Sequence, residues 1–153
     1  MKAHVSDISK RIKDDHDAFK DYINKLTALA RQDLSPETST IWGIELNKTL
    51  RAFNKELEEH FALEEDGGFM DEILIVAPEQ KYAISQLKSE HEMMTNDIQV
   101  ILKCLTDFSP ADKTQIINMK QRINALLDLL HTHESAENSI IEDTYLQDNG
   151  LSG

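Results

Sequence analysis

Residues 46–65 have the sequence LNKTLRAFNKELEEHFALEE, and this stretch decides the fold that we predict for the whole chain. Its apolar side chains recur every three or four residues, which is the period of one face of an α-helix: Leu46, Leu50, Phe53 and Leu57. The same steps continue to His60 and then to Glu64. The face that this helix turns toward the core therefore carries a histidine and a glutamate.

Three further segments show the same helical period, and no segment shows a convincing period of two. The four predicted helices cover residues 6–31, 36–65, 78–106 and 110–145. A chain of 153 residues suffices for one domain with a real core. We therefore predict an all-α four-helix bundle that forms a single domain over residues 1–153, with its core at about 6–145.

Local signals support these limits. Ser35-Pro36 and Ser109-Pro110 each offer a hydroxyl N-cap followed by proline, and Gly67-Gly68 is typical of a helix end. Residues 69–77 contain a short apolar run that fits either a short helix or a buried connector.

Extending each apolar face by steps of seven brings one histidine of every helix into the core, and two helices add a glutamate one turn later. These candidate ligands are His16, His60, Glu64, His91, His133 and Glu137. The two helical pairs repeat one another, because 44 residues separate the first two of these histidines and 42 the last two. The pattern predicts two related halves.

Six buried ionisable groups need a counterpart, because an unpaired buried carboxylate is costly. Two metal ions would satisfy them, since imidazole suits iron, zinc, copper or nickel and a carboxylate can bridge two ions. A single buried histidine is more simply explained by hydrogen bonds to its neighbours, but six groups on four faces favour a metal centre. The spacing His-x-x-x-Glu disfavours a ferritin-type site, which uses Glu-x-x-His.

One feature fits straight hairpins poorly. His16 and His91 lie about 15 residues from their inter-helix loops, but His60 and His133 lie about 23, a difference near 12 Å along a helix. We therefore expect oblique or bent starts to the second and fourth helices.

Composition excludes several classes of function. A net charge of -12 repels phosphate backbones and anionic lipid, so neither nucleic acid nor a membrane surface is an expected partner. No run of 18 apolar residues is present, and no secretory signal precedes residue 17. The single cysteine, Cys104, suits a reducing compartment, and we expect a cytoplasmic protein.

The order and spacing of these residues resemble a known family. His16, HFALEE at 60–65, EH at 90–91 and HESAE at 133–137 are similar to the hemerythrin-like, or HHE cation-binding, domain, over about residues 6–145. The resemblance implies an antiparallel up-down bundle around two oxo- or hydroxo-bridged iron ions, with manganese or zinc as alternatives. It also implies roles for the six ligands: Glu64 and Glu137 bridge, His16 and His60 bind one ion, and His91 and His133 bind the other.

The chain departs from the oxygen-carrying members of that family, because Thr95 stands where their third helix has a second histidine. This departure leaves an open position on each ion and favours binding or sensing of O2, or of a similar ligand such as NO, over carriage. The alternatives are a di-iron enzyme that activates O2 or peroxide, an iron-handling or repair protein, and a bundle without metal. The sequence does not identify a protein partner.

Other polar residues were weighed against the six. His131 lies off the core face, which predicts a surface position, and Cys104 is expected to be a small apolar filler. Glu65 and Glu134 adjoin ligands and are candidate acceptors for imidazole N–H groups.

Overall fold

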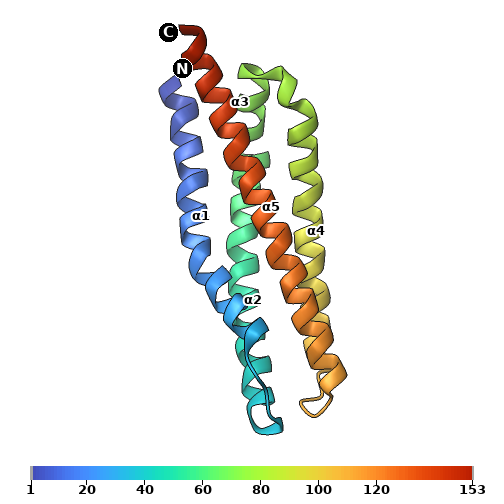
Figure 1. The fold of residues 1–153 in the computed structure, drawn as a ribbon. Helices are drawn as coiled ribbons and strands as arrows, with labels where there is room; N and C mark the ends of the chain where they lie inside the picture. The colour runs from blue at the N-terminus through green and yellow to red at the C-terminus, as the bar shows by residue number, and fades with distance from the viewer. Residues whose placement is uncertain (1, 153) are drawn as a thin grey trace.

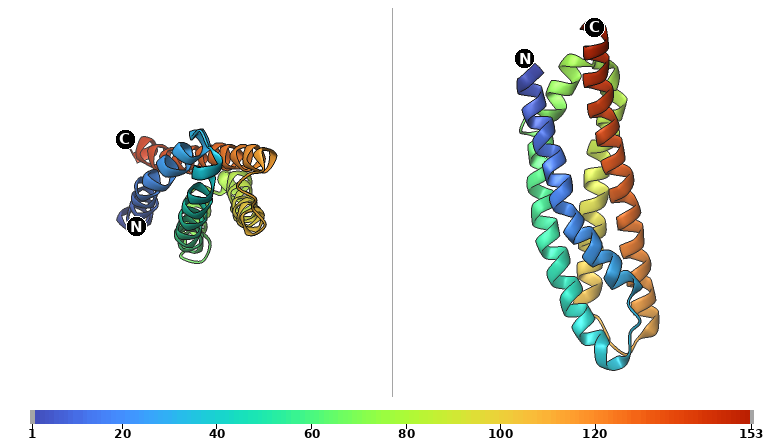
Figure 2. Two further views of the ribbon diagram at one scale, coloured as in Figure 1. Left: turned by 90° about the horizontal axis from the view of Figure 1, so that it is seen from below. Right: turned by 60° about the vertical axis from the view of Figure 1, so that its left-hand side comes forward.

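The computed structural model describes residues 2–152, with the side chains of residues 7–145, and it is a bundle of long helices (Figure 1). The elements are α1 (Lys2–Arg31), α2 (Pro36–Glu65), α3 (Phe69–Val76), a 3₁₀ turn η1 (Pro78–Gln80), α4 (Lys81–Thr106) and α5 (Lys113–Ser152). The four long helices run alternately down and up, and Figure 2 shows them grouped around a common axis. The predicted all-α, antiparallel four-helix bundle is confirmed.

Two of the predicted helix boundaries have the expected local chemistry. The Ser35 hydroxyl accepts from the Thr38 amide while the Thr38 hydroxyl accepts from the Ser35 amide, so a capping box opens α2 ahead of Pro36. After α2 the chain turns at Gly68, whose φ of 100° is strained for other residues. These two signals therefore fix both ends of α2.

The predicted start of the fourth helix at Ser109-Pro110 is wrong. The helix begins at Lys113, because the Asp112 carboxylate accepts from the amides of Thr114 at 3.0 Å and Gln115 at 3.2 Å. Aspartate is at least as good an N-cap as serine, so Asp112 takes that role two residues after the proline.

The short apolar run forms a helix, α3, which lies across one end of the bundle (Figure 1). Its buried residues belong to an apolar group that we call the upper cluster, made of Ile12, Phe69, Met70, Ile73, Ile84, Leu87, Ile140 and Ile141. The short-helix alternative is therefore the correct one, and α4 follows only after η1.

A larger apolar group, the lower cluster, fills the rest of the interior. Its members are Phe19, Leu26, Ala30, Trp42, Leu46, Leu50, Phe53, Leu57, Phe61, Met94, Ile98, Ile101, Leu102, Met119, Ile123, Leu126 and Leu130. Burying one such leucine or phenylalanine stabilises a fold by roughly 1.5–3 kcal/mol. The six candidate ligands lie between the two clusters along the helices, so apolar packing holds the helices together on both sides of them.

The sequence predicted a difference in height between the two histidines of each helical pair. The connectors between the helices remove this difference. Residues 32–35 are non-helical and run along the bundle axis (Figure 1), so α2 begins well below the end of α1. Four extended residues span up to about 14 Å, which matches the offset. The late start of α5, at Lys113, likewise reduces the difference in height between His91 and His133. The rings of His16 and His60 consequently lie at one level, with their centroids 5.3 Å apart.

Among the described residues, no helix combines the length and the apolar character that crossing a membrane requires.

Candidate metal centre

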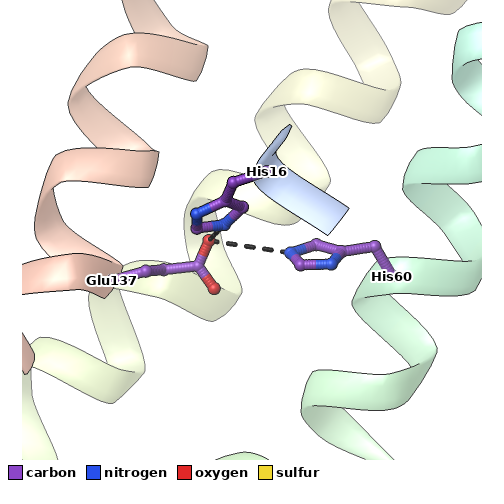
Figure 3. Close-up of side chains that lie close together, drawn as sticks. All are labelled: His16, His60 and Glu137. Atoms are coloured by element: carbon purple, nitrogen blue, oxygen red, sulfur yellow. Dashed lines mark hydrogen bonds and ion pairs between the residues drawn. The ribbon is translucent and has the colours of Figure 1, made fainter. Parts of the chain in front are cut away.

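The structure brings all six sequence-predicted residues into one buried layer. The two glutamates are fully buried and the four histidines are at most 6% exposed. They divide into two groups, and within each group the ligand atoms lie within 4.8 Å of one another. We call His16, His60 and Glu137 group A (Figure 3) and Glu64, His91 and His133 group B.

The glutamate of group B also contacts group A. Glu64 Oε1 lies 3.0 Å from His91 Nε2, and the same oxygen lies 3.4 Å from His60 Nε2. Because α2 supplies both His60 and Glu64, the helix offers one residue to each group. Glu64 therefore lies between the two histidine pairs.

The glutamate of group A does the same from α5. Glu137 Oε1 lies 3.0 Å from His16 Nε2, 3.8 Å from His60 Nε2 and 3.3 Å from His133 Nε2. It contacts three imidazoles, whereas Glu64 contacts two. Both carboxylates occupy the position that a ligand shared by two ions would need.

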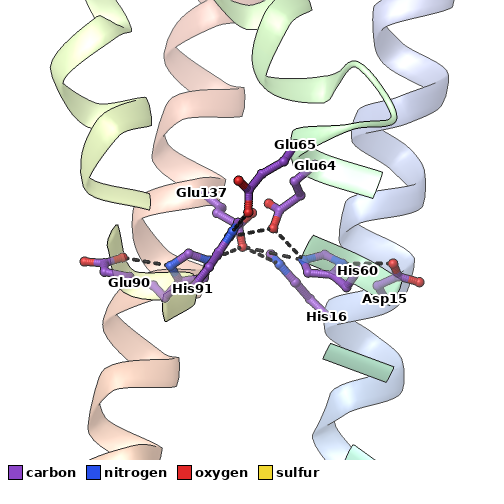
Figure 4. Close-up of polar contacts among 9 residues, drawn as sticks. Asp15, His16, His60, Glu64, Glu65, Glu90, His91 and Glu137 are labelled. Carbon is purple, nitrogen blue, oxygen red and sulfur yellow. Dashed lines mark hydrogen bonds and ion pairs between the residues drawn. The ribbon is translucent and has the colours of Figure 1, made fainter. Parts of the chain in front are cut away.

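A second layer of carboxylates surrounds the histidines (Figure 4). Three imidazoles use Nδ1–H to donate to a carboxylate on a neighbouring helix, as His60 to Asp15 at 2.9 Å, His91 to Glu65 at 2.8 Å and His133 to Glu90 at 2.7 Å. A proton held on Nδ1 leaves the Nε2 lone pair free to bind a cation and fixes the plane of the ring.

Sequence reasoning proposed Glu65 for this outer layer and missed Asp15 and Glu90. A signal was present, because each missed carboxylate directly precedes a candidate ligand, His16 or His91. The signal could not be interpreted from one helix, since each of these carboxylates serves the histidine of the next helix. Glu134, the other acceptor proposed from the sequence, makes no hydrogen bond to a histidine in the described structure, and its Oε1 is buried without a partner.

The protonation equilibria of the histidines differ. Burial, together with the neighbouring imidazoles of His91, His60 and His16, lowers the pKa of His133 to about 2. Burial also lowers the pKa of His91, although Glu65 opposes the shift. For His60 burial again lowers the pKa, but hydrogen bonds and charges from Glu137 and Asp15 outweigh it, so the pKa is raised.

The donor atoms at the centre fit a bound cation. Several buried atoms have no hydrogen-bond partner in the described structure, namely Nε2 of His60, His91 and His133, both Glu64 oxygens and Glu137 Oε2. Unsatisfied buried polar atoms are rare in folded proteins and call for an explanation. Burial raises the pKa of Glu137, but His16 and His60 outweigh that effect and lower it, so this carboxyl is anionic. A cation at each group would satisfy these atoms.

One side of group B is accessible from a surface groove between α2 and α4, with a volume of about 580 Å³. His91 and half-buried Thr95 line this groove, and Phe61 stacks on the His91 ring with centroids 3.9 Å apart. Four carboxylates also line it: Glu58, Glu65, Asp66 and Glu92. The groove offers a small molecule or a cation a route toward His91.

Two residues weighed from the sequence lie outside the centre. His131 is exposed, as predicted. The expectation that Cys104 is an apolar filler is wrong, because its thiol-bearing side chain is exposed on α4. Its position beside the core face left it room to turn toward solvent.

Comparison with known proteins identifies the family of this bundle. No curated protein sequence and no solved structure matches the chain. A family model described as the hemerythrin HHE cation binding domain matches residues 7–145, which include all six residues of groups A and B. Because that match spans nearly the whole chain, the protein belongs to the hemerythrin HHE cation-binding domain family.

Proposed function

We propose that the protein is a non-haem di-iron protein that binds or senses O2, or a similar small ligand such as NO, at a carboxylate-bridged centre. The observation that carries this proposal is the division of the buried layer into two groups that share their carboxylates. Each group contains two histidines and one glutamate. Two imidazoles and one carboxylate with open positions are the donor set of non-haem iron(II) sites that react with O2.

In this proposal His16 and His60 would hold one ion, His91 and His133 would hold the other, and Glu64 and Glu137 would be shared by both. Bound iron would supply a redox-active Lewis acid with positions free for a small ligand. The chain itself supplies the imidazoles of His60, His91 and His133, which are held by Nδ1–H bonds to Asp15, Glu65 and Glu90. Manganese or zinc would fit the same donors.

Binding or sensing is favoured over carriage by the region next to His91. Thr95 is one helical turn from His91 and supplies no imidazole, so group B has no further histidine on α4. The groove lined by His91 and Thr95 gives a ligand access to this side. A small molecule bound there would meet Phe61 and the Thr95 hydroxyl.

A second candidate is an iron-handling protein or an enzyme that activates O2 or peroxide. The acidic lining of the groove favours it, because four carboxylates beside His91 attract cations toward the centre. Both candidates fit a reducing cytoplasm, where iron(II) and reduced Cys104 persist.

Rapid mixing of the anaerobic, iron(II)-loaded protein with O2 or NO tests the proposal. We expect fast formation of near-ultraviolet and visible charge-transfer bands, followed by autoxidation when the ligand is O2. A stable adduct that releases O2 intact would make the protein a carrier. Absence of reaction with either gas would contradict ligand binding and, together with transfer of iron to a chelating acceptor, would establish the iron-handling alternative.

A further inference from the structure

A series of aromatic contacts joins the surface of α1 to the metal centre. The phenol ring of Tyr22 stacks on Phe53 of α2, with the ring centroids 5.1 Å apart and the planes at 14°. Phe53 meets Phe19 edge to face at 5.4 Å, and Phe19 meets the ring of His60 in group A in the same way at 5.1 Å. Aromatic rings at these separations are in direct contact. Packed side chains therefore connect Tyr22 with a candidate metal ligand.

The hydroxyl group of Tyr22 has an acceptor for its proton. It donates to Glu56 Oε1 on α2 at 3.0 Å, which is within the distance at which a carboxylate can take a proton. Both residues are half-buried, so they lie near the surface. Glu56 also lines a cavity of about 260 Å³ between α1 and α2, together with Phe19 and His60. Tyr22 thus combines an oxidisable ring, a proton acceptor and contact with the centre.

The other oxidisable aromatic side chains do not combine these features. The hydroxyl of Tyr82 accepts from a glutamine amide, and this residue is 76% exposed. Tyr145 pairs with the hydroxyl of Ser9, and Trp42 Nε1 donates to a backbone carbonyl. Within residues 7–145, none of these three polar groups bonds to a carboxylate. Packing alone explains aromatic rings in a core, but it requires neither the Tyr22 hydroxyl nor the carboxylate beside it.

We propose that Tyr22 and Glu56 form a redox pair that exchanges single electrons with the metal centre. This inference rests on the proposed function, since the one-electron oxidant arises when O2 or peroxide is reduced at the centre. The O–H bond of Tyr22 breaks, its electron goes to that oxidant, and its proton goes to the Glu56 carboxylate. The products are a neutral phenoxyl radical, a carboxylic acid and a centre reduced by one electron. An electron from a small reductant such as ascorbate, with the proton returned by Glu56, restores the phenol.

Freeze-quench electron paramagnetic resonance tests the proposal on the iron(II)-loaded protein mixed with O2 or peroxide. We expect a tyrosyl radical that is absent from Tyr22→Phe, although this variant keeps the ring that stacks on Phe53. Tyr82→Phe and Tyr145→Phe are matched controls and should retain the signal. Glu56→Gln keeps an acceptor oxygen for the hydroxyl but cannot take its proton, so the radical should form roughly 100-fold more slowly.

The outcomes on the loaded protein separate clearly. A radical that survives Tyr22→Phe, or that forms at an unchanged rate in Glu56→Gln, overturns the inference. Oxidation of the iron without any tyrosyl radical overturns it as well. A chain that binds no iron refutes the proposed function, and the metal-free protein then decides the inference.

Flash-generated tris(bipyridine)ruthenium(III), a one-electron oxidant, is the probe for the metal-free protein. High salt is used, so that the loss of one surface charge has little effect on the encounter. In Tyr82→Phe/Tyr145→Phe, which retains Tyr22 alone, adding Glu56→Gln should slow tyrosyl formation roughly 100-fold, as followed by transient absorption. In Tyr22→Phe/Tyr145→Phe, which retains Tyr82 alone, the same change should leave the rate unaltered. An unchanged rate in the Tyr22 chain, or equal slowing in both chains, overturns the inference without reference to metal.

Discussion

Groups A and B contain the same three side chains, two histidines and one glutamate, yet their surroundings differ. In group B both imidazoles donate to outer carboxylates, Glu65 and Glu90. In group A only His60 does so, to Asp15, while His16 Nδ1 has no hydrogen-bond partner in the described structure.

The electrostatics differ in the same way. Burial lowers the pKa of both group B histidines, whereas Glu137 and Asp15 raise that of His60. The repeated sequence pattern therefore produces two sites that are similar in donors and unequal in how firmly those donors are held. Donor type decides whether a cation binds, and the outer partners decide how strongly each ion is retained.

The largest expected effect is on the shared carboxylates. Glu137→Ala should reduce metal content from about two ions per chain to well under one, because its oxygen contacts histidines of both groups. Glu64→Ala should cost less, since Glu64 contacts one imidazole fewer. Elemental analysis with far-ultraviolet circular dichroism measures both, and helical content should persist because the two apolar clusters remain.

His131→Ala is the control for these variants, because His131 is exposed on the same helix as His133. If His131→Ala loses metal and His133→Ala retains it, then His131 and not His133 is the ligand on α5, and the assigned core face of that helix is wrong.

The outer carboxylates should act on one group each. Asp15→Asn is expected to weaken the ion of group A, and Glu90→Gln the ion of group B, by roughly tenfold in each case. Competition with a chelator of known affinity measures the two constants. Equal weakening of both ions by either variant would show that the groups respond as one unit and would remove the distinction between them.

The pH dependence of stability should have opposite signs in the two groups. His133 titrates near pH 6.5 when unfolded, but its pKa in the fold is about 2, so unfolding takes up a proton below pH 6.5 and acid destabilises the metal-free protein. His60 has a raised pKa, so its contribution is present below pH 6.5 and is lost as pH rises through the folded value.

His133→Gln should therefore flatten the fall of the thermal midpoint between pH 7.5 and 5.5, and His60→Gln should steepen it. Differential scanning calorimetry on metal-free samples measures both slopes. A change of the same sign in the two variants would disprove the assigned difference.

The smallest expected effect is on the rate at which ligands reach group B, and it should follow from changing Phe61. Phe61 stacks on His91, an interaction worth about 0.5–1.5 kcal/mol, so Phe61→Leu should speed ligand or chelator access to group B a few-fold. Release from group A serves as the internal reference. An unchanged rate at group B would mean that ligands do not enter through the groove between α2 and α4.

Much of this arrangement could be predicted from the sequence because the helical period is strong. The row from Leu46 to Leu57 placed His60 and Glu64 in the core, and the same extrapolation placed the other four residues. The residues on the core face of a single helix can be predicted from the sequence, because the helical period alone identifies them.

Features that depend on two helices were not predictable in this way. Asp15 and Glu90 lie beside a ligand of their own helix but serve a histidine of another, so only the packed structure shows their role. The start of α5 was mispredicted for a local reason, since Asp112 and Ser109 both qualify as caps and the chain uses the aspartate. The height of the histidines depended on the path of residues 32–35, which no periodicity determines.

The central claim is that two cations bind between the shared carboxylates, and anaerobic titration of the metal-free protein with iron(II) tests it most directly. Bound iron, read from the change in near-ultraviolet absorption and checked by elemental analysis after desalting, should saturate at about two ions per chain. The Glu137→Ala protein should not reach that value. Saturation of the unaltered protein at one ion, or no binding by a fully helical chain, would contradict the account.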